Sequence, residues 1–472
     1  VHIADVSFFV KENSLLDYEA RERGTSVYLV TENIPMLPRI LCDALCSLHG
    51  NVDRLAFSVI WELTPEGEKI SEKFVRSVIC SKAQLDYGKA HEMIVSPEKF
   101  VGEVEQDCVA AVNDLNEIAK QLRAKRYENG SISLDNAEIH FEMDENNEII
   151  SVAPYIRYDS HFLVEEFMLL ANISVAEKLY SSFHFDVDSE LSETNSEEKQ
   201  KNTSNLGDES EDETGAAVLR WHPKPDERKL EEFAKQCEGL GLEVDCTNSQ
   251  TLHKSIQKIQ EEMDGPRMEA ILCLATFSMQ SAQYIATSGD VPKSTFHHYA
   301  LNLPLYTHFT SPIRRYPDLI VHRQLGAIVA GEKQNISRSL ARSICEKCNE
   351  RKRGADYASR DCWRLYLNKF LHSGRIFAKG VVIEVNKSGC TVLVPDYDVR
   401  DKISLNDAKL YSLSYVKEAK KLTVTFTNSG SLQASVTLEL LQLVDVELLH
   451  SSVNFCKTIS LRLMEPGELE QK

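Results

Sequence analysis

The sequence predicts an α+β fold that ends in a small closed β-barrel of the OB type. Over residues 1–372, strand-like apolar runs are interspersed with segments whose apolar residues recur every three or four positions, the spacing of amphipathic helices. Beyond residue 373, five short strand patterns separated by turns fill about 75 residues, which is typical of such a barrel. The composition, 42% hydrophobic and 26% charged, is that of an ordinary globular protein.

The opening segment, residues 1–10, is a β-rich apolar run with no turn or helix cap before it, so we expect it to lie inside a sheet. Because the chain begins there at Val1 and not at a methionine, we also expect a fragment of a longer protein. Residues 34–38 contain two prolines, too many for a helix interior, and predict a rigid loop.

Helical spacing returns further along the chain. Apolar residues spaced by three or four predict an amphipathic helix over 104–125, and 163–179 reads as a largely buried helix. Residues 131–157, between them, alternate as strands do. Helical patterns resume over 229–286 and, after a dense polar cluster near residues 299–316, extend to about residue 372.

The net charge of −19 argues at first against a nucleic-acid partner, since polyanions prefer basic surfaces. However, residues 186–214 carry eleven acidic side chains against Lys199 and Lys201, so the other residues carry about −10. The segment 186–215 has almost no apolar groups, and we expect a disordered acidic insertion there. A regulatory, RNA-mimicking or protein-scaffolding role is its alternative. Net charge therefore does not exclude RNA.

No apolar run approaches the ~18 residues that cross a bilayer, and no signal peptide is recognisable. We therefore expect a cytoplasmic protein with no membrane partner. The twelve cysteines follow no disulfide framework, a pattern typical of reduced proteins. The pair Cys345 and Cys348 has no second pair nearby to complete a zinc site, so buried or surface thiols are the better interpretation.

Five stretches carry a resemblance to a known family. Residues 298–316, HYALNLPLYTHFTSPIRRY, closely resemble the signature of the RNase II/RNase R exoribonucleases, the RNB-domain family. Four other stretches resemble the same family in the same order: HIADVS at 2–7, RGTSVYL at 23–29, IPMLP at 34–38 with LCSL at 45–48, and VEEFMLLAN at 164–172. The resemblance covers nearly the whole chain apart from the acidic insertion.

The resemblance implies an RNB ribonuclease domain, a mixed sheet surrounded by helices, over residues 1–337. It further implies a helical connector over 338–372, an OB-fold RNA-binding barrel over 373–450 and a tail over 451–472. Such barrels bind RNA by stacking and backbone charge. Lys379 and Lys402 are plausible contacts, but exposed lysines are usually only solvated, and we assign them no role.

The activity implied by the resemblance is Mg²⁺-dependent hydrolysis of single-stranded RNA from its 3′ end to nucleoside monophosphates. The family's metal ligands are closely spaced aspartates upstream of the opening strand, so we expect them before Val1 and expect the fragment to be inactive. Asp5 is then a supporting group. The alternative is a pseudonuclease, an RNA-binding regulator that has lost the metal site.

Within the family, the amino-acid sequences of residues 167–172 and 298–315 most resemble those of a cytoplasmic eukaryotic branch. Members of this branch act apart from the exosome and prefer uridine-tailed RNA. The resemblance thus implies single-stranded RNA as the partner, and we expect a monomer that is independent of the exosome.

The resemblance assigns Arg314 to the scissile phosphate, where a planar guanidinium suits phosphate oxygens. The alternative is a surface arginine in a salt bridge. Arg315 is equally compatible with phosphate contact and with surface pairing. A helix that begins near Pro317 would leave Arg314 just before its N-terminus, where anions are favoured.

The remaining site residues also follow from the resemblance. Tyr28 matches the aromatic residue that stacks on the 3′-terminal base, although a core tyrosine is an alternative. Glu166 matches the glutamate that contacts the terminal nucleotide, since a carboxylate on an apolar helix needs a partner; its neighbour Glu165 could equally be exposed. The residues expected on the floor of the site are Tyr306, His308 and Thr310, of which His308 is as readily a structural histidine.

Overall fold

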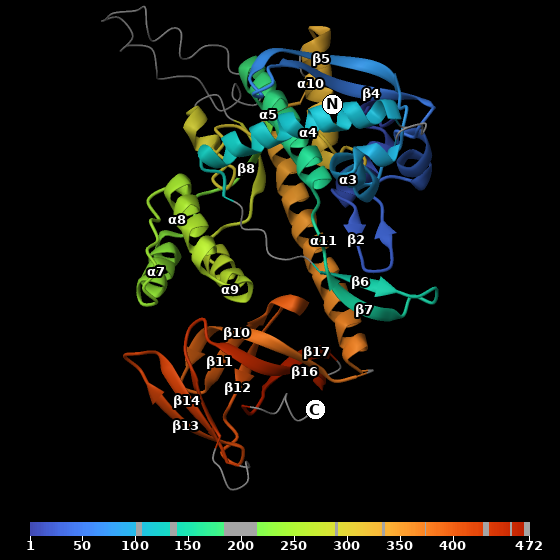
Figure 1. Ribbon diagram of the computed structural model, residues 1–472. Coiled ribbons are helices and arrows are strands. Elements are labelled where there is room, and N and C mark those ends of the chain that lie inside the picture. The colour runs from blue at the N-terminus through green and yellow to red at the C-terminus, as the bar shows by residue number, and fades with distance from the viewer. Residues whose placement is uncertain are drawn as a thin grey trace, which may run out of the picture.

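The computed structural model describes residues 1–100, 106–132, 139–183, 215–287, 291–332, 336–372, 374–427, 434–453 and 456–466. The acidic insertion expected at 186–215 lies outside these residues except for Gly215. The α+β fold with a terminal barrel is confirmed. Figure 1 shows helices and short sheets in the upper part, joined to the barrel below by the long helix α11 (Arg338–His372).

A three-stranded antiparallel sheet contains the beginning of the chain, with β4 between β1 and β5. Its strands are β1 (His2–Ala4), β4 (Asp53–Leu63) and β5 (Lys69–Cys80). The opening run was expected to be strand throughout, and this was wrong beyond Ala4, because α1 (Val6–Phe9) follows at once. Asp5 is the reason: its carboxylate accepts a hydrogen bond from the Phe8 amide at 3.2 Å, which satisfies a free donor at the helix start.

The next segment carries the first residues of the site. It consists of α2 (Leu15–Arg23), β2 (Val27–Tyr28), β3 (Asn33–Ile34) and a π-helical turn (Ile40–Leu45). The loop expected over 34–38 contains no helix. Its Met36 and Leu37 are buried in the central core, and the Met36 amide donates to Ser26 Oγ at 2.9 Å. The loop is therefore held by packing as well as by its prolines.

The two helices expected from spacing are both present and slightly longer than predicted. These are α4 (Gln106–Glu128) and α5 (Asp159–Phe183), which contact each other. The segments around them are α3 (Tyr87–Val95), a 3₁₀ turn (Pro97–Phe100), and the hairpin of β6 (Ile139–Met143) and β7 (Ile149–Pro154). Tyr158, just before α5, stacks on His91 of α3, and His161, in the first turn of α5, stacks on Tyr87 of α3. These contacts hold α3 against the start of α5.

The strands β8 (Val218–Trp221) and β9 (Gln283–Ala286) form a two-stranded antiparallel ribbon. Between its strands the chain forms α7 (Glu227–Glu238), α8 (Ser249–Glu262) and α9 (Gly265–Thr276). After β9 come a 3₁₀ turn (Lys293–Phe296) and α10 (Tyr316–Ala330). The central core includes Phe57, Phe309 and Tyr316, all fully buried. Each such aromatic side chain contributes about 2–3 kcal/mol by leaving water.

The barrel begins after α11 and has two sheets with strand orders β12-β11-β10-β16-β17 and β13-β14-β15. Its strands are β10 (Ile376–Asn386), β11 (Gly389–Val394), β12 (Val399–Ser404), β13 (Tyr411–Val416), β14 (Lys421–Phe426), β15 (Ser435–Leu438), β16 (Leu443–Val453) and β17 (Cys456–Leu463), with a 3₁₀ turn (Pro395–Tyr397). The first and last strands of the larger sheet, β12 and β17, contact each other, so this sheet nearly closes. The boundary expected at residue 450 falls within β16.

The helix α11 enters both parts of the molecule. Leu367 and Leu371 pack into the barrel core, and His450 Nδ1 lies 2.7 Å from Asn368 Oδ1. Near its other end, Ile344, Cys345 and Cys348 belong to the central core. Burial raises the pKa of Cys348 to about 12, so these thiols are neutral core groups. None of the helices in the described ranges is long and apolar enough to cross a membrane.

Candidate active site

The polar motif of residues 298–316 is held along the ribbon strand β8. The Arg220 amide donates to the Tyr306 carbonyl at 2.7 Å, and Thr307 Oγ1 donates to the Val218 carbonyl at 2.7 Å. From the other side, Asn172 on α5 donates through Nδ2 to the Tyr306 hydroxyl at 3.0 Å and accepts from the Phe309 amide at 2.8 Å. Because Tyr306 and Asn172 are both buried, these bonds fix the motif against the core.

The end of the motif forms the start of α10, as the position of Pro317 predicted. The helix begins at Tyr316, with the proline in its first turn. Arg315 Nη2 donates to Asp318 Oδ1 at 2.6 Å and to Thr310 Oγ1 at 3.5 Å. The same Asp318 oxygen accepts from the Ser311 amide at 2.7 Å. Arg315 is thus engaged in an internal pair with a fully buried carboxylate.

Arg314 has a different environment, although it is the adjacent residue. Its side chain is exposed, and within the described ranges it has no hydrogen-bond or ion-pair partner. Its carbonyl accepts from the Ser26 amide and from Thr25 Oγ1, both at 3.0 Å. The salt bridge considered as its alternative is not formed among the described residues. Arg314 is a free cation in the loop that precedes α10, which is a favourable position for an anion.

Those bonds to Arg314 bring the segment of Tyr28 to the same place. Tyr28 is 49% exposed, so the alternative of a core tyrosine is not what the structure shows. Its carbonyl accepts from Ser359 Oγ on α11 at 2.7 Å, which fixes the backbone and leaves the ring at the surface. The structure therefore places an open aromatic face in the segment that is bonded to the loop of Arg314.

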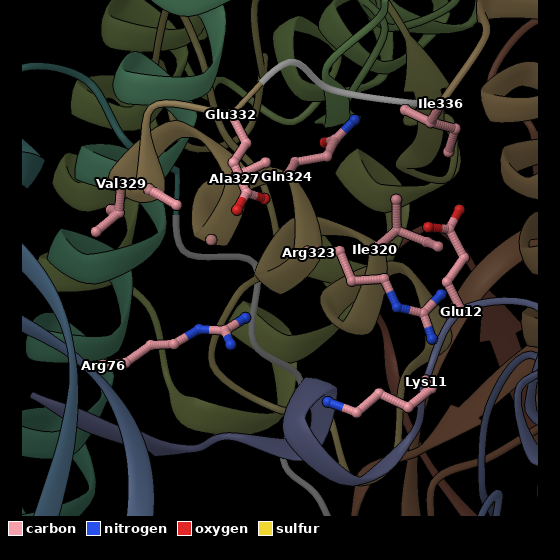
Figure 2. A pocket seen from close by; sticks show the side chains of 12 residues that line it. Lys11, Glu12, Arg76, Ile320, Arg323, Gln324, Ala327, Val329, Glu332 and Ile336 are labelled. Atoms are coloured by element: carbon pink, nitrogen blue, oxygen red, sulfur yellow. The ribbon is translucent and has the colours of Figure 1, made fainter.

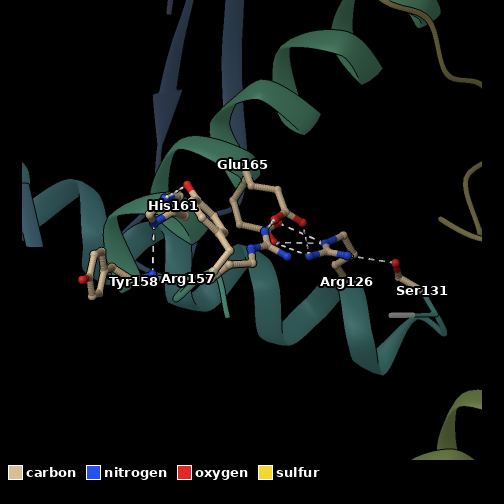
Figure 3. Close-up of polar contacts among 8 residues, drawn as sticks. Arg126, Ser131, Arg157, Tyr158, His161 and Glu165 are labelled. Atoms are coloured by element: carbon tan, nitrogen blue, oxygen red, sulfur yellow. Dashed lines mark hydrogen bonds and ion pairs between the residues drawn. The ribbon is translucent and has the colours of Figure 1, made fainter. Parts of the chain in front are cut away.

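Glu166 lies on α5 and is 3% exposed. Its carboxylate accepts from Arg126 Nε at 3.1 Å and Nη2 at 2.5 Å, while Arg126 Nη1 donates to Ser131 Oγ at 3.0 Å. Although burial opposes the charged form, the hydrogen bond and charge of Glu166 raise the pKa of Arg126. The partner that a buried carboxylate requires is therefore Arg126 within the protein. Glu165 joins the same network through Arg126 and Arg157, as Figure 3 shows.

A group of cationic and aromatic side chains surrounds His308. Its Nδ1 lies 2.7 Å from the Tyr284 hydroxyl, and the guanidinium carbon of Arg220 lies 4.5 Å from the centre of the Tyr284 ring. Burial, followed by the charges of Arg315 and Arg220, holds the pKa of His308 well below its ordinary value. His308 is therefore neutral near pH 7 and adds no charge to the site.

The histidine at the start of the motif is also neutral. His298 stacks on His222 with ring centres 5.2 Å apart, and its Nδ1 accepts from the Leu301 amide at 3.3 Å. Burial, and then the charges of His222 and Arg220, lower the pKa of His298 to about 3. Protonating either neutral histidine would thus put another charge beside the arginines.

The carboxylates near the motif do not fit a Mg²⁺ site. Asp5 accepts from Ser7 Oγ at 2.6 Å and faces Arg76 at 3.6 Å, and Asp318 is paired with Arg315. Across the part of the chain that the structure describes, no three His, Cys, Asp or Glu side chains come together as a metal site would require. Asp5 caps α1 through the Phe8 amide, and we derive no step through a metal.

A pocket of about 530 Å³ lies along α10, between it, β5 and the loop after α1 (Figure 2). The cations that line it include Arg76 and Arg323. Arg323 Nη2 donates to Asp17 Oδ1 at 2.7 Å, and Arg76 contacts Asp5. Because these charges are compensated, the pocket differs from the surroundings of Arg314.

Sequence reasoning missed three residues that shape the site: Arg126, Arg220 and Tyr284. The available signal for Arg220 was a lone cation within the apolar strand run Val218–Trp221. No local pattern marks Arg126 or Tyr284, because their partners lie 40 and 24 residues away.

Comparison with known proteins was made on sequence and on structure. Residues 1–331 match the family model described as "RNB domain". "DIS3-like exonuclease 2" of Xenopus tropicalis is 36% identical over 98% of this chain and 54% of its own length. "Exosome complex exonuclease RRP44" of Homo sapiens is 35% identical over 85% of this chain and 39% of its own. The chain thus spans about half the length, or less, of these curated relatives.

Two solved structures share the fold. Mycoplasma genitalium RNase R in complex with ribose-methylated single-stranded RNA aligns with a TM-score of 0.77 at 20% identity, covering 98% of this chain and 66% of that chain. Yeast Ssd1, described as a pseudonuclease, also aligns with a TM-score of 0.77, at 19% identity over 98% of this chain and 63% of that chain.

Proposed function

The chain belongs to the RNB-domain family, and from that premise we propose that the full-length protein degrades single-stranded RNA hydrolytically from its 3′ end. The products are nucleoside monophosphates. The observation that carries the proposal is the free guanidinium of Arg314, which lies before α10 and next to the segment of the exposed Tyr28. A cation at a helix start and an open aromatic face are what a backbone phosphate and a terminal base require.

We assign the site residues as follows. Arg314 contacts the scissile phosphate, and Tyr28 stacks on the terminal base. Tyr306, Thr310 and Arg315 form the floor, with Arg315 acting through its pair with Asp318. Glu166 contributes to nucleotide recognition while it remains bonded to Arg126.

The finer properties of the proposed enzyme follow the branch of its relatives. Its substrate is uridine-tailed RNA, its cofactor is Mg²⁺, and it acts in the cytoplasm as a monomer apart from the exosome. The aspartates that hold the metal precede Val1 in the full-length protein, so residues 1–472 alone bind RNA weakly and do not cleave it.

The test compares residues 1–472 with the full-length protein on a 5′-labelled single-stranded RNA in Mg²⁺. We expect the full-length protein to shorten the strand from the 3′ end to mononucleotides, and the shorter chain only to bind it. A circular RNA of the same sequence, which has no 3′ end, is the control and should not be shortened by either protein. Trimming by residues 1–472 at the full-length rate contradicts the assignment of the metal ligands.

A second candidate is an RNA-binding pseudonuclease, because the carboxylates beside the motif are engaged internally. The transcript upstream of Val1 separates the two. A short run of four aspartates there supports the enzyme, and their replacement by other residues supports the pseudonuclease.

A further inference from the structure

Arg220 lies on strand β8, and the pairing of β8 with β9 positions its side chain. It lies directly opposite Tyr284 in the register of β8 and β9, so the two side chains are on the same face of the ribbon. The guanidinium carbon lies 4.5 Å from the centre of the Tyr284 ring, a cation–π contact. Its amide bond to the Tyr306 carbonyl fixes the backbone against the motif.

Tyr284, beneath Arg220, is itself held by two neighbouring side chains, those of His308 and Asn349. The Tyr284 hydroxyl is bonded to His308. The Tyr284 amide donates to Asn349 Oδ1 at 2.8 Å, and Asn349 Nδ2 donates to the Tyr284 carbonyl at 2.9 Å. Since Tyr284 is only 5% exposed, the platform is rigid, and the direction of the guanidinium is set before any ligand arrives.

The charge of Arg220 is not compensated by the described residues. Within those ranges no carboxylate forms an ion pair with it; the charge of Asp356 acts on it from further away, and Asp356 is itself paired with Lys352. Burial, aided by the positive charge of Arg315, lowers the pKa of Arg220. A partly buried cation without an acid is costly unless an anion completes its environment, and a cation–π contact offsets only part of that cost.

We propose that Arg220 is a second phosphate-binding residue of the site, contacting a phosphodiester of the bound RNA strand adjacent to the phosphate held by Arg314. This inference rests on the proposed function, because it takes the ligand to be RNA. Two uncompensated guanidiniums on separate elements, β8 and the loop before α10, hold two points of the backbone. The neutral His308 orients the ring platform without repelling the cation.

The test measures binding of a 5′-fluorescein-labelled oligouridine to residues 1–472 without divalent ions, over a series of salt concentrations. Each phosphate contact to a single strand contributes about 0.7 to the slope of log K against log salt. Arg220→Met should weaken binding about tenfold and reduce the slope by about 0.7. Arg220→Lys, which keeps the charge, should retain the slope while losing part of the affinity.

The matched control is Arg21→Met, which removes another arginine stacked on a tyrosine, 5.9 Å from the ring centre of Tyr18 on the surface of α2. It should change neither affinity nor slope. Tyr284→Phe keeps the ring and the Arg220 charge but removes the bond to His308, so affinity should fall a fewfold with the slope unchanged.

The contacted phosphate is located by replacing single linkages near the 3′ end with neutral methylphosphonates. At one linkage, the methylphosphonate should weaken RNA binding by the wild-type protein but should not weaken binding by Arg220→Met any further. Free uridine 5′-monophosphate serves as a competitor, to separate a strand phosphate from that of a released nucleotide.

The inference is overturned if every methylphosphonate weakens binding by Arg220→Met as much as it weakens binding by the wild type, and if the salt slope of Arg220→Met is unchanged. Loss of monophosphate binding with intact RNA binding also overturns it. If Arg220→Met does not fold, Arg220→Gln, which is also uncharged but keeps a polar side chain, replaces it in the salt series and the linkage series. Wild type that binds no RNA at all refutes the proposed function and not the role of Arg220 alone.

Discussion

Two regions of the molecule bury arginines and treat their charges in opposite ways. Where α4 meets α5, Arg126 is 10% exposed and is held by Glu166, which is 3% exposed at its side chain. Where β8 and β9 meet the motif, the half-buried Arg220 has no ion-pair partner in the described part of the chain, and Arg314, in the loop before α10, is exposed and likewise unpaired there. The difference teaches that burial of a cation does not by itself indicate a ligand site. The compensated arginine stabilises the fold, whereas the uncompensated ones are available to an anion.

The largest expected effect belongs to the compensated region. Arg126→Met leaves the Glu166 carboxylate buried without its partner, which we expect to lower the free energy of unfolding by about 3–5 kcal/mol. Urea unfolding of residues 1–472, followed by circular dichroism, measures this change.

Replacing both partners, Arg126→Met with Glu166→Leu, is the matched control. It should recover most of the loss, because no lone charge remains. A loss below about 1 kcal/mol in the single variant would mean that the pair is not compensating a buried charge.

Acidification should destabilise the region of the motif through His298. The unfolded His298 ring takes up a proton near pH 6.5, whereas the folded ring stays neutral down to about pH 3. Lowering the pH therefore favours the unfolded chain, and this residue costs about 2 kcal/mol of stability between pH 7 and pH 5. Unfolding free energies at the two pH values measure the loss.

His298→Gln provides the control, since a glutamine does not titrate in this range. Its stability should fall less between pH 7 and pH 5 by that same amount. Parallel pH profiles for the variant and the wild type would contradict the low pKa of His298.

Arg314→Ala should weaken binding of single-stranded RNA about tenfold, or ~1.4 kcal/mol. The melting temperature should stay unchanged, because the side chain is exposed and has no partner among the described residues. Fluorescence anisotropy and thermal unfolding measure the two quantities. An equal loss of affinity in Arg21→Ala would show a general charge effect, and a lowered melting temperature would show that Arg314 supports the fold.

The smallest effect is expected for an exposed pair on the same helix as Arg126. Lys120 Nζ lies 2.7 Å from Glu117 Oε1, with both side chains more than half exposed. Lys120→Met should change the unfolding free energy by less than about 0.5 kcal/mol. A change comparable to that of Arg126→Met would remove the distinction between buried and exposed pairs on α4.

Periodicity predicted the elements whose apolar residues face one core. The helices α4 and α5 and the strand β14 are of this kind, whereas β10 and β11 were predicted from apolar runs that are buried on both faces. The β4–β5 hairpin was not predicted, because the apolar residues of β5 fall mainly in adjacent pairs on both faces, with Ile70 and Val78 exposed, and do not alternate. Five strand patterns were expected in the barrel, and its described residues form eight strands; β13 and β17 were among those not expected, and β17 lies in the segment expected to be a tail, 451–472. Their outward residues are polar, so the apolar signal is spread over alternate positions.

The site was predicted only where a contiguous motif carries it. Arg314, Arg315 and Tyr306 come from one run of sequence, and the segment of Tyr28 is bonded to the loop of Arg314 through Thr25 and Ser26. Which arginine is paired and which is free could not be predicted. That depends on Asp318 folding back in the first turn of α10 and on the register of β8 against β9, which are properties of the folded chain.

The helix α11 has a mechanical consequence for this contrast. Its 35 residues form a rod of about 50 Å that is anchored in the barrel at Leu367 and Leu371. Ser359 of α11 is hydrogen-bonded to the Tyr28 carbonyl, and Asn349 of α11 is hydrogen-bonded to the backbone of Tyr284. The backbones of both tyrosines are therefore bonded to one helix, whose C-terminal end is packed in the barrel. The positions of Tyr28 and Tyr284 are thus tied to the seating of α11 in the barrel, whereas Arg126 and Glu166, on α4 and α5, form no hydrogen bond to α11 among the described residues.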